Sequence, residues 1–229
     1  DPTHPFALVL DGMGTSQVGE LAATIGGDAL RRALSHAATN EEPVEAHIQR
    51  ALRMANDEVR TVHKDPNFCG SGTTAVLALL RAGRVFVSWV GDSMAYRVSN
   101  GKVEPLTWLH DFRTLFCRMY RLSEEEARQY MWRNVLVYFL GGELPEPIEV
   151  PSFIPRSGDR LILATDGVHN FIEPAEILAA CRLHSNSHTC AEHFVHHALS
   201  QGTRDNATCV VIAFDGLPSA ESESKVVGP

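Results

Sequence analysis

The stretch GTTAVLALLRAGRVFVSWVGDS, residues 72–93, is the part of the sequence that decides the fold class. It contains two apolar runs of strand length, Thr73–Leu80 and Val85–Val90, in which β-branched and aromatic residues are frequent. The connection between them, Arg81–Arg84, is short and contains a glycine. Because a connection of this length joins antiparallel neighbours, the stretch predicts a β-hairpin.

The residues that follow predict that the sheet continues. Gly91-Asp92-Ser93 interrupts the apolar pattern, and Met94–Val98 resumes it as a further strand. Asn100-Gly101 then gives the strongest hairpin-turn signal of the chain, because both central residues of that turn need positive φ. The middle third is therefore predicted to be an antiparallel meander.

Helical periodicity lies on both sides of this meander, and together they indicate an α+β fold. The predicted helices are Val18–Leu34, Pro43–His63, a helical stretch within Asp111–Tyr130, Glu173–Leu183 and His188–Ser200. The further predicted strands are Phe6–Leu10, Ile148–Phe153, Arg160–Ala164 and Ala207–Phe214. Gly26-Gly27 falls inside the first helix and predicts a bend there, since glycine disfavours helix.

Composition narrows the classes of function. The chain has 229 residues, 44% of them apolar, and a formal net charge of −8. One domain is expected, over residues 1–216, with a disordered tail at 217–229. The negative charge argues against nucleic acid as a partner, and no apolar run reaches the length of a membrane span. Five cysteines without a C-x-x-C pair favour free thiols in a reducing, cytoplasmic setting.

Acidic residues recur at the ends of apolar strands. Asp11, Asp92 and Asp166 each follow such a strand, and Asp205 precedes one. Carboxylates gathered in one place repel each other unless cations lie between them, and oxygen ligands suit Mg²⁺ or Mn²⁺. Each Asp taken alone is more often turn chemistry beside Gly or Asn than a metal ligand. Spacing by itself leaves a shared metal site and a set of separate turns both open.

An ordered set of motifs adds to this pattern. Together these motifs resemble the metal-dependent serine/threonine phosphatases of the protein phosphatase 2C type, most closely the bacterial members. They are Asp11-Gly12-Met13-Gly14, Gly72-Thr73-Thr74-Ala75, Val90-Gly91-Asp92-Ser93, Thr165-Asp166-Gly167 and Arg204-Asp205-Asn206-Ala207-Thr208. The resemblance extends over about Phe6–Phe214.

The resemblance implies a four-layer α-β-β-α sandwich with a binuclear Mg²⁺ or Mn²⁺ centre. Asp11 would bridge the two metals, the Gly12 carbonyl would bind one, and Asp166 and Asp205 would complete the other. Asp92 would help to hold a third ion. The implied reaction is hydrolysis of phosphoserine or phosphothreonine in a phosphorylated protein substrate by a metal-activated water, without a protein nucleophile.

The sequence also departs from the family pattern. The family places a strand upstream, with an Arg that grips the substrate phosphate and a further acidic residue, and residues 1–5 match neither. In the substrate flap, His110 and Asp111 occupy positions where the family has Asp-His-Ser, and Tyr138 replaces an Arg. The chain as given is therefore expected to be a weak catalyst. The alternative is a phosphatase-like module that binds a partner or phosphopeptide without turnover.

Overall fold

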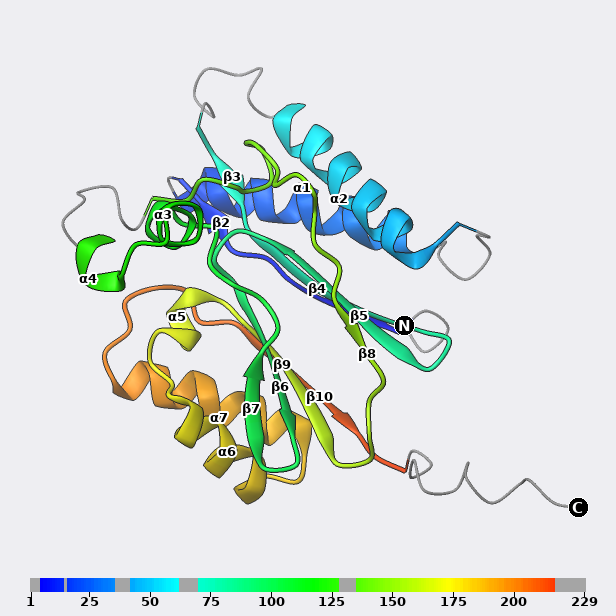
Figure 1. Ribbon diagram of the computed structural model, residues 1–229, viewed down its shortest axis with the longest axis vertical. Helices are drawn as coiled ribbons and strands as arrows, with labels where there is room; N and C mark the ends of the chain where they lie inside the picture. The colour runs from blue at the N-terminus through cyan, green and yellow to red at the C-terminus, as the bar shows by residue number, and fades with distance from the viewer. Residues whose placement is uncertain (1–4, 15, 36–41, 62–69, 128–134, 217–229) are drawn as a thin grey trace, which may run out of the picture.

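The computed structural model describes residues 5–14, 16–35, 42–61, 70–127 and 135–216 (Figure 1). Its strands form two four-stranded antiparallel sheets and one short antiparallel pair. The first sheet contains, in order, β1 (Phe6–Val9), β4 (Ala75–Arg81), β5 (Arg84–Val90) and β8 (Ser152–Phe153). The second contains β10 (Cys209–Phe214), β9 (Asp159–Ala164), β6 (Met94–Ser99) and β7 (Lys102–Pro105). The short pair is β2 (Gly12–Met13) and β3 (Gly72–Thr73).

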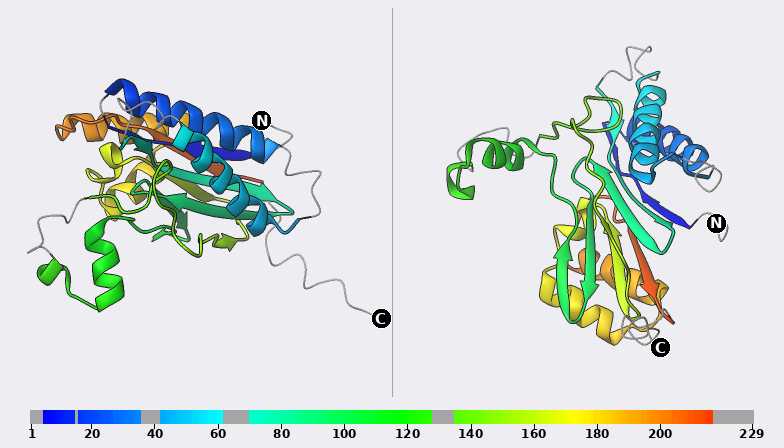
Figure 2. Two further views of the ribbon diagram at one scale, coloured as in Figure 1. Left: turned by 90° about the horizontal axis from the view of Figure 1, so that it is seen from above. Right: turned by 45° about the vertical axis from the view of Figure 1, so that its right-hand side comes forward.

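Helices lie outside both sheets, which confirms the predicted α+β class (Figure 1). The long helices α1 (Ser16–Ser35) and α2 (Val44–Arg60) lie on the first sheet. On the second sheet lie α5 (Asp166–His169), α6 (Pro174–Leu183) and α7 (Ser187–Ser200). The pair α3 (Phe112–Tyr120) and α4 (Glu124–Ala127) stands away from this body (Figure 2). None of the helices in the described residues has the length and apolar character needed to cross a membrane.

Three apolar cores separate these elements, and the two-residue period of a strand assigns side chains to them. Along β4, Leu77 and Leu79 pack against α1 and α2, whereas Val76 and Ala78 pack against the second sheet. The core between the sheets includes the fully buried ring of Trp89. The third core lies between the second sheet and helices α5, α6 and α7.

The predicted meander is wrong in one respect: the chain changes sheets after β5. Strands β4 and β5 pair in the first sheet, but β6 pairs with β7 and β9 in the second. Gly91, at φ 110°, makes the turn, and a side chain there would collide with Thr74. Because both faces of β5 are buried, its apolar pattern carries no information about which sheet the next strand joins.

Two further predictions need correction, and a third stays a prediction. Helix α1 runs unbroken through Gly26, where an added Cβ would lie 3.2 Å from a Thr73 methyl group, so this glycine serves close packing, and the bend expected there stays a prediction. The strand predicted from Ile148 is restricted to Ser152–Phe153. The helical stretch after Asp111 is split, because Arg121 adopts the left-handed conformation at φ 55°. The remainder of that stretch and the predicted disordered tail lie outside the described residues.

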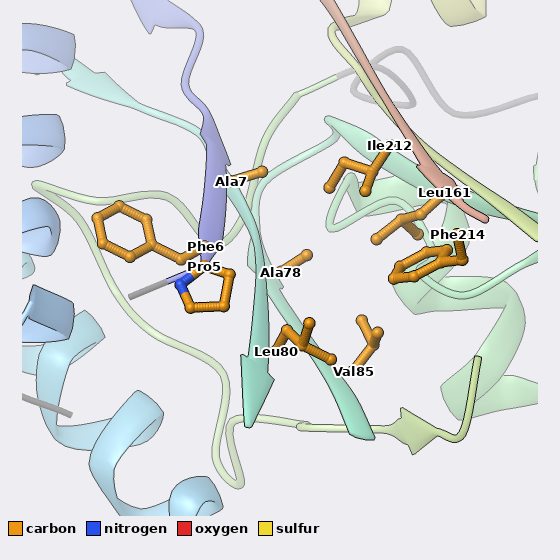
Figure 3. Close-up of a pocket in the computed structure, with 9 residues that line it drawn as sticks. All are labelled: Pro5, Phe6, Ala7, Ala78, Leu80, Val85, Leu161, Ile212 and Phe214. Atoms are coloured by element: carbon orange, nitrogen blue, oxygen red, sulfur yellow. The ribbon is translucent and has the colours of Figure 1, made fainter. Parts of the chain in front are cut away.

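An apolar cavity of about 360 Å³ opens between the two sheets, where β1 and β10 form their outer strands (Figure 3). The side chains that line it come from both sheets, and they are Pro5, Phe6, Ala7, Ala78, Leu80, Val85, Leu161, Ile212 and Phe214. The two sheets therefore pack less closely at this edge than around Trp89.

Candidate metal centre

The strand register brings the four predicted carboxylates to one end of the two sheets. Val9 pairs with Val76, and Ala75 pairs with Val90, so β1 ends where β4 begins and where β5 ends. In the second sheet Ala164 pairs with both Met94 and Cys209. Asp11, Asp92, Asp166 and Asp205 each lie within a few residues of these positions.

The backbone of Asp11 is fixed by two threonines that begin the neighbouring strand. Its N–H donates to Thr74 Oγ1 at 3.0 Å, and its carbonyl accepts from Thr74 N at 2.8 Å and from Thr73 Oγ1 at 2.9 Å. Both threonines are buried. Three hydrogen bonds to one residue leave its backbone little freedom, so the carboxylate projects from a rigid support.

The carbonyl of Gly12 follows directly and depends on a second glycine. A Cβ added at Gly19, in α1, would lie 2.7 Å from the Gly12 carbonyl oxygen, well inside van der Waals contact. A Cβ added at Gly12 would in turn lie 2.1 Å from the Gly19 carbonyl oxygen. Both positions therefore require glycine, and their close approach fixes the backbone of Gly12 against the first turns of α1.

The Asp92 segment is linked to Asp11 through side chains. Thr74 Oγ1 lies 2.7 Å from Ser93 Oγ, so one threonine supports both acidic segments. The Asp92 carbonyl accepts a hydrogen bond from His169 Nε2 at 2.9 Å. Burial lowers the pKa of His169, so the ring is neutral near pH 7 and its Nε2 carries the proton that it donates.

Asp166 and Asp205 are held together by backbone and hydroxyl contacts between their segments. Thr165 N donates to Thr208 O at 3.0 Å, and Thr208 N donates to Thr165 Oγ1 at 3.1 Å. A Cβ added at Gly167 would lie 2.2 Å from the Asn206 carbonyl oxygen. Glycine at this position therefore allows the segment of Asp205 to approach the first turn of α5.

The other three carboxylates lie close enough to Asp11 to raise its pKa. Burial, the charges of Asp166 and Asp205, a side-chain hydrogen bond with Asp166 and the charge of Asp92 raise the pKa of Asp11 from 3.8 to about 7. Burial and the nearby Asp166 also raise the pKa of Asp92 to about 6. Carboxyl groups whose pKa is raised in this way have no positive charge beside them that stabilises the ionised form. A divalent cation would supply that charge.

The donor set fits a hydrated Mg²⁺ or Mn²⁺ ion better than a closed protein cage. In the part of the chain that the structure describes, no three His, Cys, Asp or Glu side chains converge tightly enough to hold an ion among themselves. Mg²⁺ keeps several waters and takes one or two carboxylates from the protein. Pairs of carboxylates such as Asp11 and Asp166, which lie within hydrogen-bond reach of each other, offer that kind of partial coordination.

His110 and Asp111 lie at the base of the protruding helices α3 and α4. The His110 ring is only 2% exposed, stacks on Trp89 with ring centroids 5.5 Å apart, and accepts from Gly91 N at Nδ1. Burial lowers its pKa to about 4. Asp111 caps α3 by accepting from Thr114 N at 2.6 Å. Both residues anchor the α3–α4 segment to the body, and a neutral, enclosed His110 presents no charge to a substrate.

Sequence reasoning missed the residues that support the cluster. Thr74 and Ser93 lie inside the quoted motifs, but the motifs do not reveal that their hydroxyls support the acidic segments, and only their contact shows this role. His169 follows Asp166 by three residues. A helical turn beginning at Asp166 would have indicated that the two side chains lie on the same side of that turn. Thr165 was quoted only as part of a motif, although its hydroxyl joins the Asp166 and Asp205 segments.

Fold and site define an α+β protein with an acidic cluster at one end of two antiparallel sheets. Residues 2–201 match the family model described as protein phosphatase 2C, and the chain belongs to that family. It is 30% identical over 220 residues to the serine/threonine phosphatase stp of Listeria monocytogenes, a match covering 93% of this chain and 85% of that protein. It is a homologue of such phosphatases over about 90% of its length.

Solved structures agree with this assignment. The crystal structure of the Mycobacterium tuberculosis phosphatase PstP/Ppp is similar with a TM-score of 0.80 at 25% identity, covering 92% of this chain and 88% of that one. The catalytic domain of PstP in complex with two manganese ions gives a TM-score of 0.73 at 26% identity, covering 90% and 86% of the two chains.

Proposed function

We propose that this protein hydrolyses phosphoserine and phosphothreonine in phosphorylated proteins at a binuclear Mg²⁺ or Mn²⁺ centre. Asp11 would bridge the two ions, the Gly12 carbonyl would bind one, and Asp166 and Asp205 would bind the other. Asp92 would help to hold a third, weaker ion. When bound, such ions lower the pKa of a coordinated water and stabilise charge on phosphoryl oxygens.

The observation that carries this proposal is the gathering of the four acidic segments at one end of the two sheets. Three of them raise the pKa of Asp11, and two belong to a different sheet from the strand that precedes Asp11. Turn chemistry at separate strand ends does not require such an arrangement. The family supports the same reading, since a related catalytic domain crystallised with two manganese ions.

The surrounding residues would orient these ligands and hold them still. Thr74 would fix the backbone of Asp11 and, through Ser93, the turn that carries Asp92. His169 would keep the Asp92 carbonyl directed toward α5. Phosphoryl transfer depends mainly on positioning and charge stabilisation, so rigid support of this kind contributes to rate without touching substrate.

We also infer that residues 1–216 form one phosphatase domain with the four-layer α-β-β-α arrangement. The three successive cores support this layering, because each lies between one pair of adjacent layers. In this domain His110 and Asp111 would belong to the substrate flap, where their contribution is to anchor α3. A cytoplasmic location remains a prediction from the free cysteines.

The proposal is tested by Mn²⁺-dependent hydrolysis of a phosphothreonine peptide by the wild-type protein and by Asp166→Asn. Removing one ligand is expected to lower the rate by about 10²-fold or more, since charge stabilisation of the transition state is lost. Asp57→Asn is the matched control, because Asp57 is an exposed acidic residue on α2. Equal activity of Asp166→Asn and the wild-type protein would contradict the proposed centre.

The hydrolysis assay, combined with calorimetry of Mn²⁺ binding, separates hydrolysis from the alternative of a non-catalytic binding module. That alternative is favoured if calorimetry detects Mn²⁺ binding that Asp166→Asn abolishes, while no variant and no concentration of Mn²⁺ gives turnover. Its sequence basis is the absence of a match to the family's phosphate-gripping Arg in residues 1–5.

A further inference from the structure

Two cysteines face each other across the helix pair that covers the second sheet. Cys181 lies near the end of α6 and Cys190 in the first half of α7, and their sulfur atoms are 4.0 Å apart. Cys190 is fully buried in the third core, and Cys181 is half-buried beside it. A disulfide needs the sulfurs about 2 Å closer than this.

A small cavity reaches Cys181, one member of this pair, from the surface. Its volume is about 150 Å³, and its lining includes Cys181, Arg160 and Arg182. This space admits a molecule of the size of water or hydrogen peroxide. The Arg160 Nη1 atom is buried and makes no hydrogen bond within the described residues, although its Nη2 donates to Ser185 O at 3.0 Å. The N–H groups of Arg160 Nη1 are therefore available to donate to a small polar molecule or to a thiolate.

The electrostatics of the pair favour a reactive sulfur. The hydrogen bond with Cys181 and the charge of Arg160 lower the pKa of Cys190 to about 7, whereas the same bond and burial raise that of Cys181. Either sulfur can be the donor, so the proton that remains on the pair can lie on Cys190 and leave Cys181, the sulfur at the cavity, as the thiolate. Cys209, the neighbouring third cysteine, differs, because burial raises its pKa to about 12 and keeps its thiol protonated.

We propose that Cys181 and Cys190 form a peroxide-responsive dithiol that closes reversibly to a disulfide between α6 and α7. Hydrogen peroxide oxidises Cys181, the sulfur that lines the cavity: an S–O bond forms, the O–O bond breaks and water leaves, which produces a sulfenic acid. The partner sulfur then forms the S–S bond as the S–O bond breaks, and the thiol proton leaves with the oxygen as a second water. This site is independent of the proposed phosphatase function.

Peptide mapping tests the proposal directly, because trypsin separates the three cysteines. Cys181 falls in the peptide Leu161–Arg182, Cys190 in Leu183–Arg204 and Cys209 in Asp205–Lys225. The folded wild-type protein is exposed to hydrogen peroxide, alkylated under denaturing conditions and digested without reduction. We expect the first two peptides to be joined, two hydrogens lighter than their sum, with at least a tenfold excess over any other linkage. Dithiothreitol should release them.

Matched variants identify the partners. Cys181→Ser and Cys190→Ala should abolish the linkage, whereas Cys209→Ser and Cys117→Ser should retain it, because Cys117 lies on the separate helix α3. If a variant fails to fold, the peptide map of the oxidised wild-type protein still tests whether Cys181 and Cys190 are linked. The proposal is overturned if Cys181 and Cys190 are both recovered alkylated under conditions that oxidise Cys117. It is also overturned if the dominant linkage runs through Cys209.

Discussion

Removing the charge of Asp11 should make the metal-free protein more stable at pH 8. The unfolded chain ionises Asp11 near pH 3.8, whereas the folded protein holds that proton to about pH 7. Folding therefore opposes ionisation of this group, and the free energy of unfolding falls as the pH rises from 3.8 to 7. The penalty is complete above pH 7. Asp11→Asn keeps the shape of the side chain and removes the penalty.

The size of the effect follows from the pKa difference. A raised pKa of about 7 against 3.8 corresponds to about 4 kcal/mol, at 1.36 kcal/mol for each pKa unit. Asp11 is half-buried, and solvent screening reduces this to roughly 2 kcal/mol. For a domain of this size, that is a rise in melting temperature of about 4–8 °C. Mn²⁺ should reverse the order, because it stabilises the folded wild-type protein by mass action.

Thermal unfolding followed by circular dichroism measures both effects. The wild-type protein, Asp11→Asn and the control Asp57→Asn are melted in EDTA at pH 8 and pH 5, and again at pH 8 with millimolar Mn²⁺. In EDTA the advantage of Asp11→Asn should shrink from pH 8 to pH 5, because the penalty is only partly developed there. If Asp11→Asn melts below the wild-type protein in EDTA at pH 8, the carboxylates do not repel each other as argued.

The remaining predictions concern the supports of the site and helix α1. Thr74→Ala should lower the free energy of unfolding by about 1–3 kcal/mol in urea titrations, because it leaves the buried Asp11 N–H without its acceptor; an unchanged midpoint would contradict this. Gly167→Ala should abolish Mn²⁺ binding in calorimetry, since its Cβ would lie 2.2 Å from Asn206 O; wild-type affinity would show that the segment of Asp205 is not held there. Gly27→Ala should stabilise α1 by roughly 0.5–1 kcal/mol, because its Cβ would make only ordinary contacts, the nearest at 3.7 Å; a lower melting temperature would refute it.

Much of the local structure was predictable because it depends on neighbours in the sequence. The hairpin β4–β5 and the turn at Asn100-Gly101 both follow from residues a few positions apart, and each is observed. The two amphipathic helices of the first half were also predictable, because every third or fourth residue of α1 and α2 is apolar and packs in the first core.

Predictions failed where both faces of a strand are buried, and where the role of a side chain depends on a contact with a distant segment of the chain. Both faces of β5 are apolar, so the sequence pattern did not show that the chain crosses to the other sheet at Gly91. The apolar surroundings of His110 could not be foreseen, because Trp89 and Tyr138 come from different segments. The same holds for Thr74, whose hydroxyl contacts segments 63 and 19 residues away.

The sequence alone determined the α+β class, the order of most helices and strands, and the placing of four Asp residues at strand ends, because each follows from local periodicity and turn chemistry. The tertiary structure decided which strands share a sheet. It also decided that Asp92, Asp166 and Asp205 lie close enough to Asp11 to raise its pKa. It also decided that His169 supports Asp92 and that Cys181 meets Cys190. These depend on distances between segments far apart in the chain, and such distances are set by the packing of the three cores together.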